Sequence, residues 1–159
     1  MRRRRVFLCA IVLVLGYALL CGAGGLFVAE AALHPGRRVL LDSDRQHAEL
    51  TVQRHDSQLT DVSIHGEDGS TLRGWILRPR QGNRDFVILL HGLSDNRMGM
   101  IGYAEFFVSH GYNVLMADAR AHGASDGGLA TYGLVEATDI RRWVDWLRDH
   151  ERADRLRFW

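Results

Sequence analysis

The chain has 159 residues, of which 47% are hydrophobic and 25% are charged, a composition typical of a globular protein and not of a disordered one. All 20 basic residues are arginine, and outside the run Arg2 to Arg5 the chain carries 16 arginines against 19 acidic residues, a formal charge of −3. Because the folded part lacks a basic cluster, the charge pattern gives no indication of nucleic-acid binding.

The stretch from residue 6 to residue 29 contains no charged residue and predicts a transmembrane helix. At about 1.5 Å per residue this helix would be about 36 Å long, enough to cross a hydrocarbon core of about 30 Å. The arginine-rich flank, residues 1–5, places the N-terminus in the cytoplasm by the positive-inside rule. We therefore expect a single-pass membrane protein in which residues 30–47 form a linker and the remainder is exported.

Other interpretations of this stretch stay open. Ala29-Glu30-Ala31 has the spacing of a signal-peptide cleavage site, which would release a secreted protein, although the apolar region is longer than usual. The stretch could also be a buried core helix. Both cysteines, Cys9 and Cys21, lie here, so the folded part is predicted to have no disulfide and no cysteine-based metal site.

Short alternating stretches after the linker predict half-buried β-strands. Residues 48–53 and 60–65 alternate apolar and polar side chains, and residues 71–79 resume a strand after the turn signal Asp68-Gly69. We therefore expect an antiparallel hairpin near the start of the folded domain, residues 48–159.

The pattern then changes to one typical of a parallel α/β sheet. Residues 86–90 and 113–117 are continuously apolar, as strands covered on both faces are. Helices with one apolar stripe are predicted over residues 97–110 and about 133–150, and residues 155–159 resemble the start of another strand. This order of elements predicts parallel strands joined by right-handed crossovers.

Two motifs stand at the ends of the two apolar strands. His91-Gly92-Leu93 follows the first, and Asp118-Ala-Arg-Ala-His-Gly-Ala-Ser-Asp-Gly127 follows the second. Together with the order of elements, they resemble the α/β-hydrolase superfamily, and in particular its bacterial esterase, lipase and serine-aminopeptidase-like branch. The resemblance covers residue 48 to the end and implies hydrolysis of a small-molecule ester or amide, with no metal and no cofactor.

The resemblance also assigns a role to the first motif. The backbone N–H of the residue after His-Gly, here Leu93, is expected to stabilise the oxyanion of the transition state, while His91 and Gly92 shape the turn. Without the second motif, His91-Gly92 could equally be a tight turn at a strand end.

The stretch from Gly123 to Gly127 fits the Gly-x-Ser-x-Gly pattern of a serine nucleophile, with Ser125 at its centre. A nucleophile elbow needs a strand that runs directly into the serine and a helix that begins directly after it. Here the apolar strand ends eight residues before Ser125, and a loop follows. We therefore interpret the segment as a structural loop in which acidic and basic side chains pair or bind backbone and Ser125 or Asp126 caps a turn. Its expected members are Asp118, Arg120, His122, Gly123, Ser125 and Asp126.

The resemblance further implies that the elbow follows the next strand, so that the nucleophile, the triad acid and the triad histidine would lie beyond Trp159. We therefore expect this chain to be the N-terminal part of a hydrolase, inactive by itself. Two alternatives remain: a catalytically inactive anchored fragment or binding module, and an unrelated enzyme that uses Ser125 directly as its nucleophile.

Overall fold

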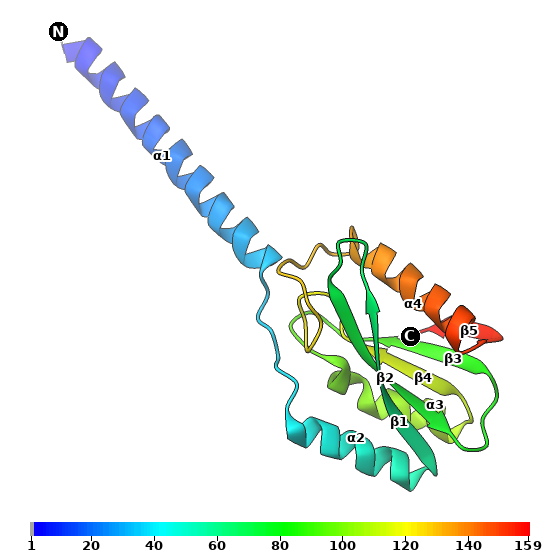
Figure 1. The fold of residues 1–159 in the computed structure, drawn as a ribbon. Coiled ribbons are helices and arrows are strands. Elements are labelled where there is room, and N and C mark those ends of the chain that lie inside the picture. Colours follow the sequence, from blue (N-terminus) through cyan, green and yellow to red (C-terminus); the bar gives the residue numbers. More distant parts are fainter. Residues whose placement is uncertain (1) are drawn as a thin grey trace. The chain divides into compact units, whose positions relative to one another are not determined.

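A computed structural model describes residues 2–159, which divide after His34 into two units. The second unit is built on a five-stranded sheet with the strand order β1-β2-β4-β3-β5 (Figure 1). β1 pairs with β2 and β2 with β4 in antiparallel fashion, whereas β3 pairs in parallel with both β4 and β5. The predicted hairpin followed by parallel strands is thus confirmed. The strands are β1 (Ser57–His65), β2 (Thr71–Pro79), β3 (Asp85–Leu90), β4 (Asn113–Ala117) and β5 (Arg155–Phe158).

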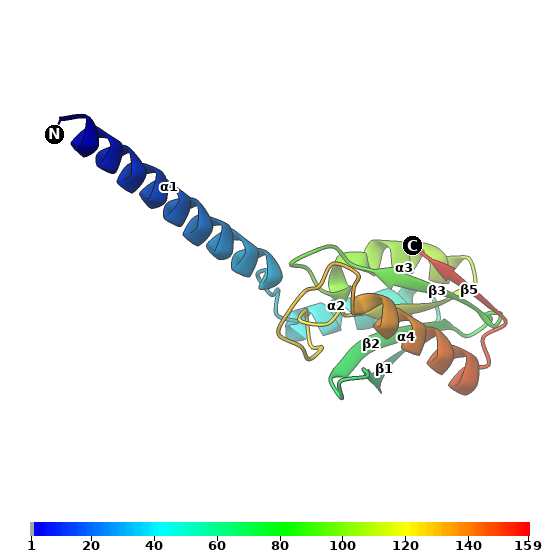
Figure 2. The ribbon, with the colours of Figure 1, turned by 90° about the horizontal axis from the view of Figure 1, so that it is seen from above.

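Helices cover both faces of this sheet (Figure 2). One face packs against α2 (Asp42–Arg54) and α3 (Ile101–Ser109), and the short 3-10 helix η1 (Arg97–Met100) leads into α3. The other face packs against α4 (Glu136–His150). Successive strand residues point to opposite faces, so the continuous apolar runs of β3 and β4 present apolar side chains to the helices on both faces. Every residue of β4 is buried.

The strand predicted at residues 48–53 is wrong, because these residues belong to α2. Its buried residues Ala48, Thr51 and Val52 are spaced by three and four positions, as on one face of a helix. Over only six residues this sequence also fits the apolar–polar alternation of a strand, so the stretch was too short to distinguish a helix from a strand. The helix also takes in residues 42–47, which were expected to belong to the linker.

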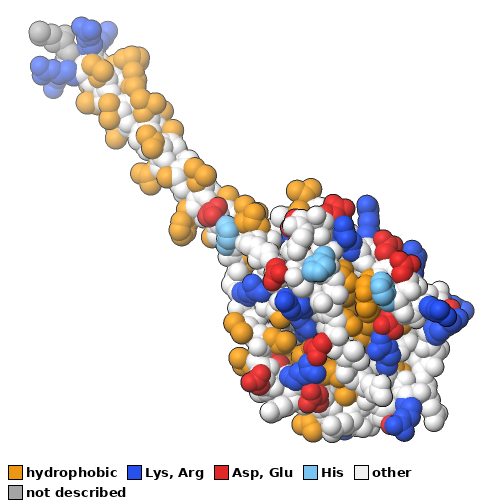
Figure 3. Space-filling view, viewed as in Figure 1, with side chains coloured by type: hydrophobic (Ala, Val, Ile, Leu, Met, Phe, Trp, Pro, Cys, Tyr) orange, Lys and Arg blue, Asp and Glu red, His pale blue; other side chains and the backbone are white. Residues whose placement is uncertain are grey.

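The first unit is α1 (Arg2–Leu33), a single helix with none of its residues buried, unlike a core helix. Apolar side chains cover it along its length, and arginines stand at its start (Figure 3). By length and composition α1 could cross a membrane.

Candidate active site

Two chain segments leave the sheet at the carboxyl ends of neighbouring parallel strands. β3 and β4 pair in parallel up to Leu90 and Ala117, so their carboxyl ends lie side by side. We call residues 91–96, which follow β3, the first loop, and residues 118–127, which follow β4, the second loop. The carboxyl ends of the strands are where open α/β sheets bind their ligands.

The first loop leaves the backbone donors of Gly92 and Leu93 without a partner among residues 2–159. The side chain of Leu93 is exposed, and its N–H makes no hydrogen bond with any other group of residues 2–159. The backbone turns sharply around it, since Asp95 N–H donates to Gly92 O over 3.3 Å and Ser94 has a φ of 62°. A fixed N–H without a partner is what an oxyanion-binding donor requires.

Two histidines join the loops. Ala119 N–H donates to Nε2 of His91 over 3.0 Å, and Ser94 N–H donates to Nε2 of His122 over 3.1 Å. The two ring centroids are 5.3 Å apart. Burial lowers the pKa of His91 below its ordinary value, which favours the neutral ring that these contacts need.

Asp118 begins the second loop and is held by Arg97, the first residue of η1. Its carboxylate accepts from Arg97 Nη2, from Arg97 N and from Ala124 N, each over 2.7 Å. The side chains of Arg97 and Asp118 are 3% and 0% exposed, so this ion pair is shielded from water. The Arg97 guanidinium also lies 5.1 Å from the centre of the Trp75 ring.

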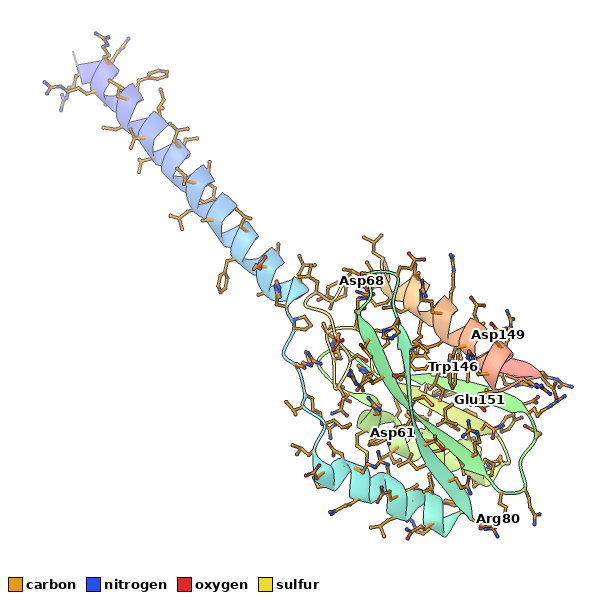
Figure 4. The ribbon with its side chains drawn as sticks, viewed as in Figure 1. Asp61, Asp68, Arg80, Trp146, Asp149 and Glu151 are labelled. Carbon is orange, nitrogen blue, oxygen red and sulfur yellow. The ribbon has the colours of Figure 1, made fainter. Side chains whose placement is uncertain are left out.

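Arg120 forms a second cluster of charges. It donates to the two carboxylate oxygens of Asp139 over 2.7 and 2.9 Å and to Asp68 over 2.8 Å. Hydrogen bonds to both carboxylates raise the pKa of Arg120 above its ordinary value. Asp68 lies in the turn between β1 and β2 (Figure 4), so Arg120 connects this hairpin, the second loop and α4.

The partners of these charged residues differ in part from the expectation. Asp118 does bind loop backbone, at Ala124 N, but its ion-pair partner is Arg97, 21 positions earlier in the sequence. Arg120 pairs with Asp139, 19 positions later. Arg97 was missed because an arginine at the start of a predicted helix is normally solvated.

Ser125 is fully buried, with 0% of its surface exposed. Its hydroxyl donates to Asp118 O and accepts from Arg73 N, each over 2.9 Å, so it bridges the second loop and β2. Arg37 binds the same segment from outside and donates to Gly123 O and Ser125 O. None of the hydrogen-bond partners of the Ser125 hydroxyl is a histidine.

Gly123 and Asp126 complete the closure of the second loop. Gly123 has a φ of 49°, and a Cβ at this position would lie 2.1 Å from Oδ2 of Asp118. Only glycine therefore fits there. Oδ2 of Asp126 accepts from Thr71 N over 3.0 Å, which fastens the loop to the start of β2.

An apolar cavity of about 620 Å³ lies between α3 and the end of β5. It is lined by Gly99, Gly102, Tyr103, Phe106, Phe107 and Trp159. Trp159 continues the pairing of β5, since Leu90 N donates to its carbonyl over 3.1 Å. The end of β5 therefore lies beside the start of the first loop. Within residues 2–159, no group of three or more His, Cys, Asp or Glu side chains is placed to hold a metal ion.

Comparison with known proteins gives one family match and several similar structures. The model of the family X-Pro dipeptidyl-peptidase (S15 family) matches residues 36–155. The esterase Pf2001 of Pyrococcus furiosus is 34% identical with a TM-score of 0.66, over 79% of this chain and 47% of the esterase. An α/β hydrolase of Vibrio vulnificus, 23% identical over 75% of this chain and 39% of its own, has the same fold with a TM-score of 0.59.

A further relative is the uncharacterized protein YqkD of Bacillus subtilis. It is 31% identical over 81 residues, which are 51% of this chain and 26% of YqkD. The chain thus spans about a quarter of this relative and just under half of the Pyrococcus esterase. Both loops lie within the range that the family model matches.

Proposed function

Because the chain belongs to the X-Pro dipeptidyl-peptidase (S15) family of the α/β-hydrolase superfamily, we propose that it supplies the oxyanion-binding part of a serine hydrolase that cleaves an ester or an amide. The observation that carries this proposal is the unpartnered N–H of Leu93 on a loop joined to its neighbour. The similarity to an esterase favours an ester substrate, whereas the family name favours the amide bond that follows an X-Pro dipeptide. Both are acyl-transfer reactions.

In such a reaction a serine oxygen attacks the carbonyl carbon while a histidine takes the serine proton. The carbonyl oxygen becomes an oxyanion, to which the Leu93 N–H donates a hydrogen bond. The histidine gives this proton to the leaving group, whose expulsion leaves an acyl-enzyme. Water then attacks the acyl-enzyme with the histidine again taking the proton, which releases the acid and returns the proton to the serine. The donor stabilises charge that is present only around the transition state, so it acts on kcat.

We place the nucleophile outside residues 1–159. Ser125 is buried and its hydroxyl is engaged by backbone on both sides, and the next helix, α4, begins only at Glu136. The end of β5 lies beside the first loop, so residues continuing this strand would emerge next to Leu93. The apolar cavity at Trp159 offers a surface that such residues could cover.

We further propose that α1 anchors the protein in a membrane, with residues 35–159 exported. Its apolar length and the arginines at its start support this topology. Cleavage after Ala29-Glu30-Ala31 is the alternative, and N-terminal sequencing of the mature protein separates the two. An intact N-terminus supports the anchor, and a start at residue 32 contradicts it.

Fluorophosphonate labelling of the native protein tests the assignment of the nucleophile. We expect protein isolated from its own membranes to react at a serine that is not among the 159 residues. The 159-residue chain expressed by itself should stay unlabelled. Labelling of Ser125 would contradict the proposal, and a native protein that ends at Trp159 and stays unlabelled would favour the inactive fragment or binding module.

The oxyanion role is tested by Leu93→Pro, which removes the N–H. In the native hydrolase we expect kcat for a chromogenic ester to fall about 100- to 1000-fold with KM nearly unchanged. Leu93→Ala is the matched control, because it keeps the N–H and trims only an exposed side chain. Equal losses in the two variants would assign the effect to the side chain and not to the N–H.

A further inference from the structure

Each of the two loops is held by a histidine of the other. His91 of the first loop accepts from Ala119 N of the second, and His122 of the second loop accepts from Ser94 N of the first. The exchange is reciprocal, and in both cases the partners are 28 positions apart in the sequence. We call these two hydrogen bonds the histidine clip.

The clip requires neutral rings that carry their hydrogen on Nδ1. Nδ1 of His91 lies 2.8 Å from Gly92 O, and Nδ1 of His122 lies 2.9 Å from Arg120 O. A carbonyl oxygen can only accept, so Nδ1 donates and Nε2 is left with the lone pair that the backbone N–H needs. If Nε2 were also protonated, its N–H would face the backbone N–H, and the hydrogen bond between them would be lost.

The clip fixes the backbone next to the proposed oxyanion donor. Ser94 directly follows Leu93 and has a φ of 62°, a conformation that residues other than glycine seldom adopt. Its N–H is the atom that His122 holds. A side chain of a different loop therefore restrains the backbone directly after the Leu93 N–H.

We propose that His91 and His122 are positioning residues that fix the oxyanion-binding loop, and that protonation of His91 breaks its half of the clip at acidic pH. The link to catalysis rests on the proposed function, whereas the clip itself does not. The charged and titratable groups that face His91 are Asp118, Asp95 and His122. Arg97 neutralises Asp118, and Arg38 pairs with Asp95.

The direction of the pH effect follows from the pKa of His91, which burial lowers below the ordinary value of 6.5. The neutral ring and its contact are complete above pH 6.5, the value in the unfolded chain. The contact is lost as the pH falls from there through the lower pKa of the folded state.

Amide hydrogen exchange followed by mass spectrometry tests the clip in the native protein, solubilised in detergent micelles. Peptides covering residues 91–96 and 118–127 are followed from about pH 8 downward, in steps through the pKa of His91, after correction for intrinsic exchange rates. Below that pKa we expect the protection of the Ala119 N–H to fall about tenfold, the loss of one net hydrogen bond. Absence of protection at the higher pH would overturn the proposal.

Variants distinguish the effect of the two hydrogen bonds from the effect of packing the imidazole rings. His122→Phe keeps a ring without an acceptor, and we expect it to lose about tenfold protection in the first loop. His122→Gln places an amide oxygen near the position of Nε2 and should restore that protection. His91→Gln keeps an acceptor that does not titrate, so it should remove most of the pH dependence. His47→Gln, at an exposed site on α2, is the matched control and should change neither.

Rates of the native hydrolase distinguish failure of the clip from failure of the proposed function. In an active enzyme we expect His122→Phe to lower kcat about tenfold with KM unchanged, and His122→Gln to restore it. If the wild-type protein hydrolyses no ester or amide, the proposed function fails while the exchange data still decide on the clip. If the enzyme is active and His122→Phe changes neither kcat nor protection, the positioning role is wrong.

Discussion

The first and second loops both follow the carboxyl ends of neighbouring parallel strands, yet they differ in whether their polar groups are hydrogen bonded within the protein. In the second loop the hydroxyl of Ser125, the carboxylate of Asp118 and the guanidinium of Arg120 are buried and hydrogen bonded within the protein. In the first loop Leu93 is exposed, and its N–H has no partner within residues 2–159. A buried polar group whose hydrogen bonds are all made internally holds structure, whereas an exposed N–H without a protein partner is accessible to water or a ligand.

Asp118→Ala should have the largest effect on stability, because it leaves the buried guanidinium of Arg97 without its counter-charge. We expect the free energy of unfolding in urea to fall by about 3–5 kcal/mol. Asp154→Ala removes an exposed pair with Arg84 and should cost at most about 1 kcal/mol. Equal losses would mean that Asp118 does not anchor the second loop.

Gly123→Ala should come next, since a Cβ would clash with Asp118 and the φ of 49° disfavours any side chain. We expect a loss of about 2–3 kcal/mol in the same unfolding experiment. Gly128→Ala is the control in the same part of the chain, because a Cβ there would meet nothing within 4 Å and its φ is not positive. It should stay within about 0.5 kcal/mol of the wild type.

Ser125→Ala tests whether the second loop is structural, because it deletes both hydrogen bonds of the buried hydroxyl. We expect unfolding to become easier by about 1–2 kcal/mol. The rate of fluorophosphonate labelling of the native hydrolase should stay the same. An unchanged stability together with abolished labelling would reverse the assignment and make Ser125 the nucleophile.

Glu136→Gln should change the pH dependence of stability and extends the comparison to the segment before α4. The Glu136 carboxylate accepts from Thr131 Oγ1 over 2.5 Å, from Thr131 N over 2.7 Å and from Gly133 N over 2.8 Å. Burial would raise the pKa of Glu136, but these hydrogen bonds outweigh it and lower the pKa to about 2.

The sign of this pH effect follows from the lowered pKa. The carboxylate stabilises the fold above the ordinary pKa of 4.5, and this contribution is lost as the pH falls toward about 2. Urea titrations across this range should show a steeper loss of stability for the wild type than for Glu136→Gln. Parallel curves would contradict the role of the carboxylate.

Much of the fold could be predicted from local patterns. The continuous apolar runs located β3 and β4, because strands covered on both faces leave no alternation, and the apolar stripes located α3 and α4. α2 was missed because residues 48–53 fit both periods, and because its acidic start was taken for solvated linker.

The site was less accessible to sequence reasoning. The motifs indicated which loops matter and singled out two residues. The catalytic role of Leu93 remains a prediction, and Ser125 was interpreted as structural. The pairing of Arg97 with Asp118 and the histidine clip depend on how β3 lies against β4, which composition does not reveal. The position of a residue at a strand end could be predicted, but its partner in another loop could not.

The two hydrogen bonds of Arg37 also bear on the timing of synthesis. Arg37 binds the carbonyls of Gly123 and Ser125, which are 86 and 88 positions further along the chain. A ribosome makes the N-terminal side first, so Arg37 must wait for most of the chain to be translated before it can form these bonds. During that delay the segment directly after α1 is open to proteases and chaperones, and replacing Arg37 would remove the two contacts that later bind it to the second loop.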